Sequence, residues 1–139
     1  MVNEEKILQK FIQIDEYLSF LNKISKSSEQ AFLKDKILIG SAKYYLQISI
    51  ECCLDVVNHI IASERFRAPR DYADSFSILE ENGILESSLV IKLRQMAKFR
   101  NRLVHLYGEI DDKFVYEFIK KDIEDIRKFQ SIITNNYIK

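Results

Sequence analysis

Residues 87 to 108, which read SSLVIKLRQMAKFRNRLVHLYG, carry the side chains best suited to chemistry on a phosphate group. No acidic residue occurs between Glu86 and Glu109, whereas five basic residues do: Lys92, Arg94, Lys98, Arg100 and Arg102. Because the formal net charge of the whole chain is zero, this segment is a local positive patch suited to binding phosphate. The alternative is a solvated helix face whose acidic partners lie on a neighbouring helix.

Arg100 stands out because it falls in the apolar seam of this segment. The seam residues recur at spacings of four and three, as in a helix face that packs against other helices or a second chain: Leu89, Leu93, Met96, Arg100, Leu103 and Tyr107. A buried arginine needs hydrogen-bonding or ionic partners, because an unpaired charge is costly away from water. Glu51 and Asp55 are candidate partners, and so is a phosphate in an interfacial cleft. A guanidinium that reaches out to solvent is the remaining alternative.

His105 lies five residues after Arg100, which is a rotation of roughly 140° on an ideal helix. The two side chains therefore do not converge on a straight helix. They converge if the helix frays toward Gly108, or if a second protomer completes the site. Asn101 and Arg102 share the side of His105 more naturally. A histidine near a helix C-terminus also has a structural interpretation, since that end stabilises the imidazolium.

The elements that position these residues are all predicted to be helices. Three glycines and one proline are too few for a strand-and-turn architecture. Apolar residues recur with helical spacing in five segments. The first two are about 4–24 and a long segment that starts at Ser27 or Asp35 and ends at about 63. A short segment from Asp71 to Asn82 follows, then about 87–106, and the last runs from Asp111 or Asp112 to about 135. The same spacing places Tyr72 and Phe114 among the inward-facing residues. Four long helices and one short one predict an all-α antiparallel bundle, and the length fits a single domain, residues 1–139.

Composition narrows the class of protein further. Cys52 and Cys53 are adjacent within a helical pattern, where neighbouring side chains diverge by roughly 100°, so we expect packed thiols in a reducing compartment. These cysteines and the two histidines show no zinc-binding spacing, and we expect neither a metal nor a cofactor. Charged residues interrupt both the N-terminus and the longest apolar zone, residues 44–61. We therefore expect no signal peptide, no membrane span and a cytoplasmic location.

The run RNRLVHLY, residues 100 to 107, resembles the signature of HEPN domains, in which an arginine and a polar residue precede a histidine. The tyrosine two residues beyond the histidine resembles the HepT branch of that family. The resemblance continues in the same order and spacing through QISIE (47–51) with Asp55 and His59, through PRDYADSF (69–76) with Leu79, and through Asn82-Gly83-Ile84. It covers nearly the whole chain, which makes it specific.

The resemblance implies a helical bundle that forms a homodimer, with Arg100 and His105 of both protomers meeting in a cleft at the interface. It also implies RNA cleavage without a metal ion. In that reaction His105 suits the general base that removes the 2′-hydroxyl proton, and Arg100 suits the cation that stabilises the phosphorane. Asn101 would orient the phosphate or His105. We expect the RNA substrate to be bound by Arg102, Lys98 and Arg94.

The HepT resemblance assigns a different role to Tyr107. The implied partner is a nucleotidyltransferase antitoxin that attaches AMP to this tyrosine, and the added negative charge would neutralise the positive patch and occupy the cleft. The alternative for Tyr107 is packing in the seam. For the whole chain, two alternatives to a toxin ribonuclease are a non-catalytic HEPN module, which binds nucleotide or scaffolds a nucleotidyltransferase, and a generic interaction bundle.

Overall fold

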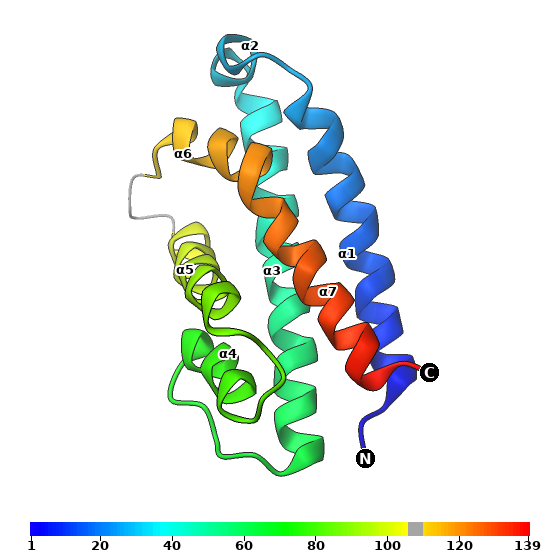
Figure 1. The fold of residues 1–139 in the computed structure, drawn as a ribbon. Coiled ribbons are helices and arrows are strands. Elements are labelled where there is room, and N and C mark those ends of the chain that lie inside the picture. Colours follow the sequence, from blue (N-terminus) through cyan, green and yellow to red (C-terminus); the bar gives the residue numbers. More distant parts are fainter. Residues whose placement is uncertain (106–109) are drawn as a thin grey trace.

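The computed structural model describes residues 1–105 and 110–139, and every regular element within them is helical. The elements are, in chain order, α1 (Glu4–Ser25), α2 (Glu29–Lys34), α3 (Lys36–Glu64), α4 (Tyr72–Glu81), α5 (Ser87–Val104), α6 (Asp112–Glu117), the π-helical segment η1 (Phe118–Asp122) and α7 (Ile123–Tyr137). The long helices α1, α3, α5 and α7 run alternately up and down, as the colours in Figure 1 show. The predicted all-α antiparallel bundle is confirmed.

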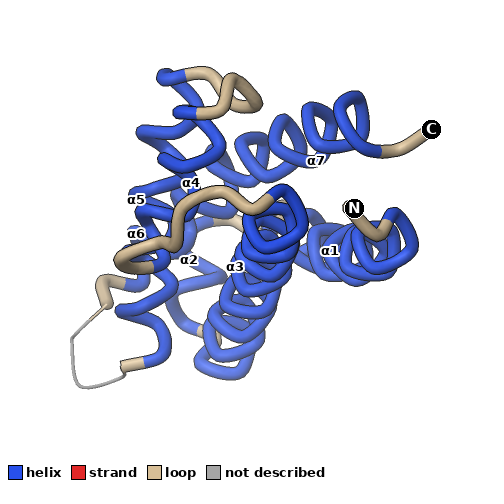
Figure 2. The backbone as a smooth tube through the Cα atoms, turned by 90° about the horizontal axis from the view of Figure 1, so that it is seen from below, coloured by secondary structure: helices blue, strands red, loops and turns tan. Residues whose placement is uncertain are grey.

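The helix α3 lies at the centre of the bundle. It packs against α1 on one side and against α4 and α5 on another (Figure 2), and its buried residues continue along its whole length, from Ile39 to Ile61. By length and composition alone α3 qualifies as a candidate membrane span, which differs from the sequence-based expectation. More than half of its apolar window is nevertheless buried within the bundle, which is the environment of a core helix.

The long second helix that the sequence predicts is divided in two. Ser28, rather than Ser27, caps α2, since its Oγ accepts a hydrogen bond from the Ala31 N–H at 3.1 Å. Asp35 then caps α3 by accepting from the Leu38 N–H at 3.0 Å. A capping residue adopts an extended backbone, here with φ −106° and ψ 95° at Asp35, so a continuous helix cannot pass through it.

Two residues that the pattern places in the core lie at its edge. Tyr72 is 45% exposed, and Phe114 is also exposed. Tyr72 is the first residue of α4, where the helix has just begun and fewer elements surround it. Phe114 contacts the buried Phe99 with ring centroids 5.3 Å apart, so it covers the core from outside. Helical spacing identifies a face but does not show where the neighbouring elements end.

Arg67 fixes the path of the connection between α3 and α4. Its guanidinium donates to Asp74 at 2.7 and 2.9 Å and to Glu81 at 2.9 and 2.7 Å. Asp74 also accepts from the Arg70 N–H at 2.9 Å. The hydrogen bonds from Arg67 hold the pKa of Asp74 well below its usual range, so this carboxylate stays charged in mild acid. The connection therefore follows a defined course past α4.

Candidate active site

A cavity of about 640 Å³ lies between α3, α4 and α5. Its lining residues are Asn58 on α3, Pro69 and Asp71 in the connection, Tyr72 and Ser75 on α4, and Arg100, Asn101, Val104 and His105 at the end of α5. Cavities of this size are typical of binding sites for small molecules. The three predicted catalytic residues, Arg100, Asn101 and His105, thus lie around one cavity of a single chain.

The Arg100 guanidinium is held from three sides. Its Nε and Nη2 donate to Glu51 Oε1 at 3.1 and 2.7 Å, and its Nη1 donates to Asn101 Oδ1 at 3.2 Å. Its Cζ lies 5.0 Å from the ring centroid of Tyr72. The side chain is only 16% exposed, so the guanidinium is oriented before any ligand binds. Among the described residues these bonds use three of the five N–H groups of a guanidinium, and two are left for an anion in the cavity.

Of the two acidic candidates, Glu51 is the one that contacts Arg100. Asp55 instead binds Lys10 on α1, with Asp55 Oδ2 and Lys10 Nζ 2.9 Å apart. Four residues along an α-helix add a rotation of roughly 40°, and this turns Asp55 from the α5 side of α3 toward α1. The sequence shows that both acids share a stripe of the helix, whereas the neighbouring helices decide which cation each one meets.

His105 lines the cavity from the C-terminal end of α5. α5 ends at Val104, and His105 follows with φ −89° and ψ 76°, outside the helical region. Its N–H still donates to the Asn101 carbonyl oxygen at 3.0 Å. This is the helical bond to the fourth residue before, so His105 keeps roughly the expected rotation of 140° from Arg100. Both residues nevertheless line the same cavity of one chain. His105 is exposed, so a ligand can reach it from solvent.

The three residues predicted to bind RNA lie outside this cavity. Arg94 is half-buried, and its Nη1 donates to Ser77 Oγ on α4 at 2.6 Å. Lys98 and Arg102 are exposed on α5. The three residues follow one another at intervals of four, so they share one face of that helix. Their contact with RNA stays a prediction.

Asn58, Tyr72 and Ser75 belong to the cavity, although no signature in the sequence assigns them to a site. Asn58 lies in the polar stripe of α3, together with Glu51 and Asp55. The sequence signal for Asn58 is therefore its place in a row of polar residues along the most apolar helix of the bundle. Tyr72 and Ser75 fall within the run PRDYADSF, which is part of the HEPN resemblance, but that resemblance assigns neither of them a role in a site.

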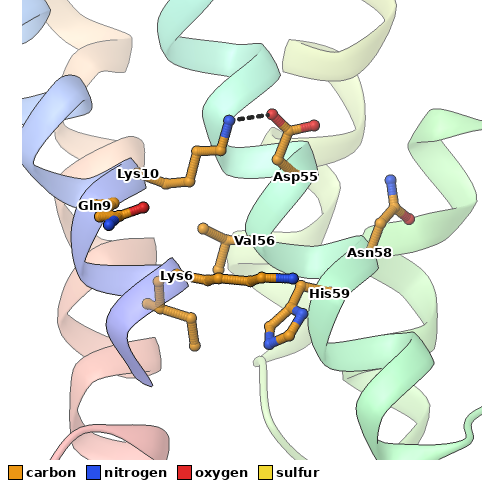
Figure 3. A pocket seen from close by; sticks show the side chains of 8 residues that line it. Lys6, Gln9, Lys10, Asp55, Val56, Asn58 and His59 are labelled. Atoms are coloured by element: carbon orange, nitrogen blue, oxygen red, sulfur yellow. Dashed lines mark ion pairs between the residues drawn. The ribbon is translucent and has the colours of Figure 1, made fainter. Parts of the chain in front are cut away.

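A second cavity, of about 470 Å³, lies between α1 and α3. Lys6 and Lys10 line it from α1, and the ion pair between Lys10 and Asp55 connects its two walls (Figure 3). Asn58 lines both cavities, but Figure 3 shows its side chain on the side of α3 that is turned away from Lys6. This second cavity has no guanidinium pre-oriented beside an exposed imidazole, so the first cavity is the better candidate for phosphate chemistry.

His59, in the second cavity, connects α3 to the start of α1. Its Nε2 accepts a hydrogen bond from the Asn3 N–H at 2.9 Å, which requires the neutral imidazole. Burial lowers the pKa of His59, and the positive charges of Lys6 and the N-terminus lower it further. His59 thus has a structural role in which protonation is unfavourable.

We expect acidification to destabilise the wild-type protein more than a His59→Gln variant. The folded state binds the His59 proton less readily than the unfolded chain does. This contribution to stability is therefore complete above the unfolded pKa of about 6.5 and is lost as the pH falls toward the folded pKa. Glutamine keeps an acceptor that does not titrate. Urea unfolding at about pH 7.5 and about pH 5 measures the free energy of unfolding of both proteins, and equal losses would contradict this role for His59.

The arrangement of metal-ligating side chains and thiols can be read from the part of the chain that the structure describes. Within residues 1–105 and 110–139, no group of three or more His, Cys, Asp or Glu side chains is arranged to hold a metal ion. Cys52 and Cys53 are buried free thiols. Burial raises the pKa of Cys52 to about 11 and raises that of Cys53 further, so neither is a nucleophile near neutral pH. Tyr107, the predicted modification site, lies outside the described residues.

Comparison with known proteins agrees with the HepT resemblance. The model of the family described as ribonuclease HepT-like matches residues 14–133, a range that contains the whole lining of the first cavity. The mRNA nuclease HepT of Shewanella oneidensis is 28% identical over 127 residues, which cover 91% of this chain and 95% of that protein.

Two solved structures with the same fold come from toxin–antitoxin systems. A toxin–antitoxin structure with AMP-PNP has a TM-score of 0.88 and 27% identity, and the match covers 94% of this chain and 98% of that one. The tri-AMPylated HEPN toxin of Shewanella oneidensis in complex with the MNT antitoxin has a TM-score of 0.87 and 28% identity, and the match covers 94% of this chain and 97% of that one. The chain therefore belongs to the HepT-like family of ribonucleases.

Proposed function

We propose that this protein is a metal-independent endoribonuclease that acts as the toxin of a toxin–antitoxin pair. The observation that carries the proposal is that Arg100 and His105 line one cavity of a single chain, with Arg100 already oriented by Glu51. Family membership supports the ribonuclease class, and the Shewanella oneidensis relative is an mRNA nuclease. A non-catalytic scaffold has no physical need for a pre-oriented guanidinium beside an exposed imidazole.

In the proposed reaction, His105 removes the proton from a ribose 2′-hydroxyl. The 2′-oxygen attacks the adjacent phosphorus, and the two N–H groups of Arg100 not used by Glu51 and Asn101 bind the non-bridging oxygens as negative charge develops there. The bond from phosphorus to the 5′-oxygen then breaks, and this oxygen takes up a proton from the imidazolium or from water. The products are a 2′,3′-cyclic phosphate and a free 5′-hydroxyl, and no step requires a metal ion.

Two neighbours of Arg100 act as positioning residues in this scheme. Glu51 accepts two hydrogen bonds from the guanidinium and is itself held by Gln47 Nε2 at 3.2 Å. Asn101 accepts a third bond from Arg100 through Oδ1, which leaves its Nδ2 to orient the phosphate or His105. Fixing the guanidinium in advance reduces the reorganisation needed when charge develops on the phosphate.

We further propose that the protein forms a homodimer in which the cavities of the two protomers open into a shared cleft. Exposed Val104, at the rim of the cavity, supplies apolar surface for such pairing. The positively charged face of α5, with Arg94, Lys98 and Arg102, would contact phosphates on either side of the cleavage point. In this proposal the protein acts in the cytoplasm.

Control by a nucleotidyltransferase antitoxin that attaches AMP to Tyr107 is also part of the proposal. Two of the solved structures similar to this chain are of toxin–antitoxin systems, and one of these toxins is tri-AMPylated. Tyr107 follows His105 by two residues. An attached AMP would bring negative charge next to the side chains that bind the scissile phosphate, and it would compete with RNA for them.

Incubation of the purified full-length protein with single-stranded RNA in excess EDTA tests the proposed function. We expect cleavage to fragments that end in a 2′,3′-cyclic phosphate and begin with a 5′-hydroxyl, and mass spectrometry of the fragments identifies both ends. A parallel reaction with added Mg²⁺ shows whether a metal increases the rate. The proposal fails if no cleavage occurs in either buffer, and its metal independence fails if cleavage occurs only with Mg²⁺.

A further inference from the structure

Opposite Arg100 and His105, the first cavity is lined by side chains that have no role in the proposed reaction. α5 contributes the basic side, whereas α3, the connection and α4 contribute Asn58, Pro69, Asp71, Tyr72 and Ser75. Of these five only Asp71 is charged, and its carboxylate caps α4 by accepting from the Asp74 N–H. An RNA nucleotide shows the same division, because its phosphate is charged while its base is flat, apolar on its faces and polar at its edges. The second side of the cavity thus matches the base, as the basic side matches the phosphate.

Tyr72 provides an aromatic surface of fixed position. The preceding residue caps α4, with the Asp74 N–H donating to Asp71 Oδ1 at 2.7 Å, and Arg67 holds the connection on its other side. The ring lies against the Arg100 guanidinium, yet 45% of the residue is exposed. Tyrosine rings that are partly exposed beside a phosphate-binding cation are the surfaces on which unstacked RNA bases stack.

Asn58 provides a hydrogen-bond donor of fixed orientation. Its Oδ1 accepts from Ser75 Oγ at 3.1 Å, and Ser75 is fully buried, with 0% exposed. This bond orients the amide plane, so Nδ2 points away from Ser75. Among the residues that the structure describes, none accepts a hydrogen bond from Nδ2. Asn58 is half-buried and lines the cavity, so its amide group can donate to a ligand there.

We infer that Asn58 and Tyr72 form a nucleobase subsite for the ribonucleotide whose 2′-hydroxyl attacks. Tyr72 stacks on the base, and Asn58 Nδ2 donates to a carbonyl oxygen at its edge. This inference rests on the proposed ribonuclease function. Uracil presents a carbonyl oxygen where adenine presents an amino group, so the subsite favours uridine over adenosine at that position.

DNA strands that each contain one ribonucleotide test the subsite, because attack by a 2′-hydroxyl can then cleave only one bond. The strands differ only at that nucleotide, which carries uracil, adenine or no base. For the wild-type protein we expect kcat/KM on the uridine strand to exceed that on the abasic strand by roughly 10-fold. We expect it to exceed that on the adenosine strand by roughly five-fold.

Three variants separate the two parts of the subsite. Tyr72→Leu should bring the uridine and abasic strands to similar rates, whereas Tyr72→Phe should keep their difference. Asn58→Asp still accepts from Ser75 but replaces the donor with an acceptor, so it should shift the uridine-to-adenosine ratio by roughly 10-fold toward adenosine. Tyr44→Leu is the matched control, because Tyr44 is an exposed tyrosine of α3 that does not line the cavity; it should leave all ratios unchanged.

Ratios between strands distinguish base binding from support of Arg100. If Tyr72 only held the guanidinium, Tyr72→Leu would slow cleavage of all three strands equally, and the subsite would be refuted. Equal wild-type rates on the uridine and abasic strands would refute it as well, while ribonuclease activity would stand. If the wild-type protein cleaves none of the strands, fluorescence anisotropy with all-deoxy strands measures binding instead. A Tyr72-dependent preference for the strand with a base then supports the subsite, and equal affinities overturn it.

Discussion

Replacement of His105 by alanine is expected to reduce the kcat of RNA cleavage by about 10³-fold, within the range typical of lost general acid–base catalysis. The side chain is exposed and follows the last residue of α5, so its removal should leave the bundle folded. The measurement is single-turnover cleavage of RNA in EDTA, with helix content checked by circular dichroism.

His59→Gln is the matched control for this variant, because the chain contains only two histidines and His59 lines the other cavity. It should retain the wild-type rate of cleavage near neutral pH. A folded His105→Ala protein with a wild-type kcat would remove His105 from the mechanism. Equal losses in the two variants would indicate a general effect on the fold.

Replacement of Arg100 by alanine is expected to reduce kcat by about 10² to 10³-fold, the usual effect of losing one group that stabilises developing negative charge. Arg100→Lys should recover little of this rate. An ammonium group keeps the charge, but it cannot bind Glu51, Asn101 and a phosphate in the planar arrangement that a guanidinium allows. The rates are measured with the same RNA in EDTA.

Stability must be measured alongside activity for Arg100, because the alanine variant leaves Glu51 without its cation. Side chains in this pair are 16% and 29% exposed, so we expect a loss of about 1 to 3 kcal/mol in the free energy of unfolding. Glu51→Gln combined with Arg100→Ala removes the unpaired charge and should restore part of that stability without restoring cleavage. If the double variant regains activity, Arg100 acts through the fold rather than on the phosphate.

Mixing the Arg100→Ala and His105→Ala proteins examines the proposed dimer. If each reaction uses Arg100 of one protomer and His105 of the other, mixed dimers contain one intact site, and activity returns. If both groups act from the same chain, as their placement around one cavity allows, each protomer of the mixed dimer is defective and activity stays low. Light scattering of the mixture shows whether dimers form.

Most of the bundle follows from local features of the sequence. The apolar seam of α5 is buried at Leu89, Leu93, Met96 and Leu103, and α4 lies between Asp71 and Asn82, where a capping residue and a turn signal predict its ends. Helical spacing and capping act over a few residues, which is why both can be recognised from the sequence alone.

The predictions that differ from the structure depend on surroundings rather than on spacing. The sequence predicts one central helix that starts at Ser27 or at Asp35. The structure has two helices there, and Ser28 caps the first while Asp35 caps the second. Tyr72 fits the core pattern, but it lies where the core ends. No pattern predicts the π-helical turn of η1, because the extra residue per turn is accommodated by packing rather than encoded in the spacing.

The sequence by itself determined the helical class and the positive segment, and it predicts Arg100, Asn101 and His105 as the groups that act on a phosphate. Only the tertiary structure decided how these groups meet. Glu51 is separated from Arg100 by 49 positions, and whether it or Asp55 pairs with Arg100 depends on which helices flank α3. His105 and Arg100 line one cavity with residues of α3 and α4, and the packing of these helices around α5 creates that cavity. Separation along the chain carries little information about proximity in space, because the packing of distant helices is set by the whole core rather than by any one segment.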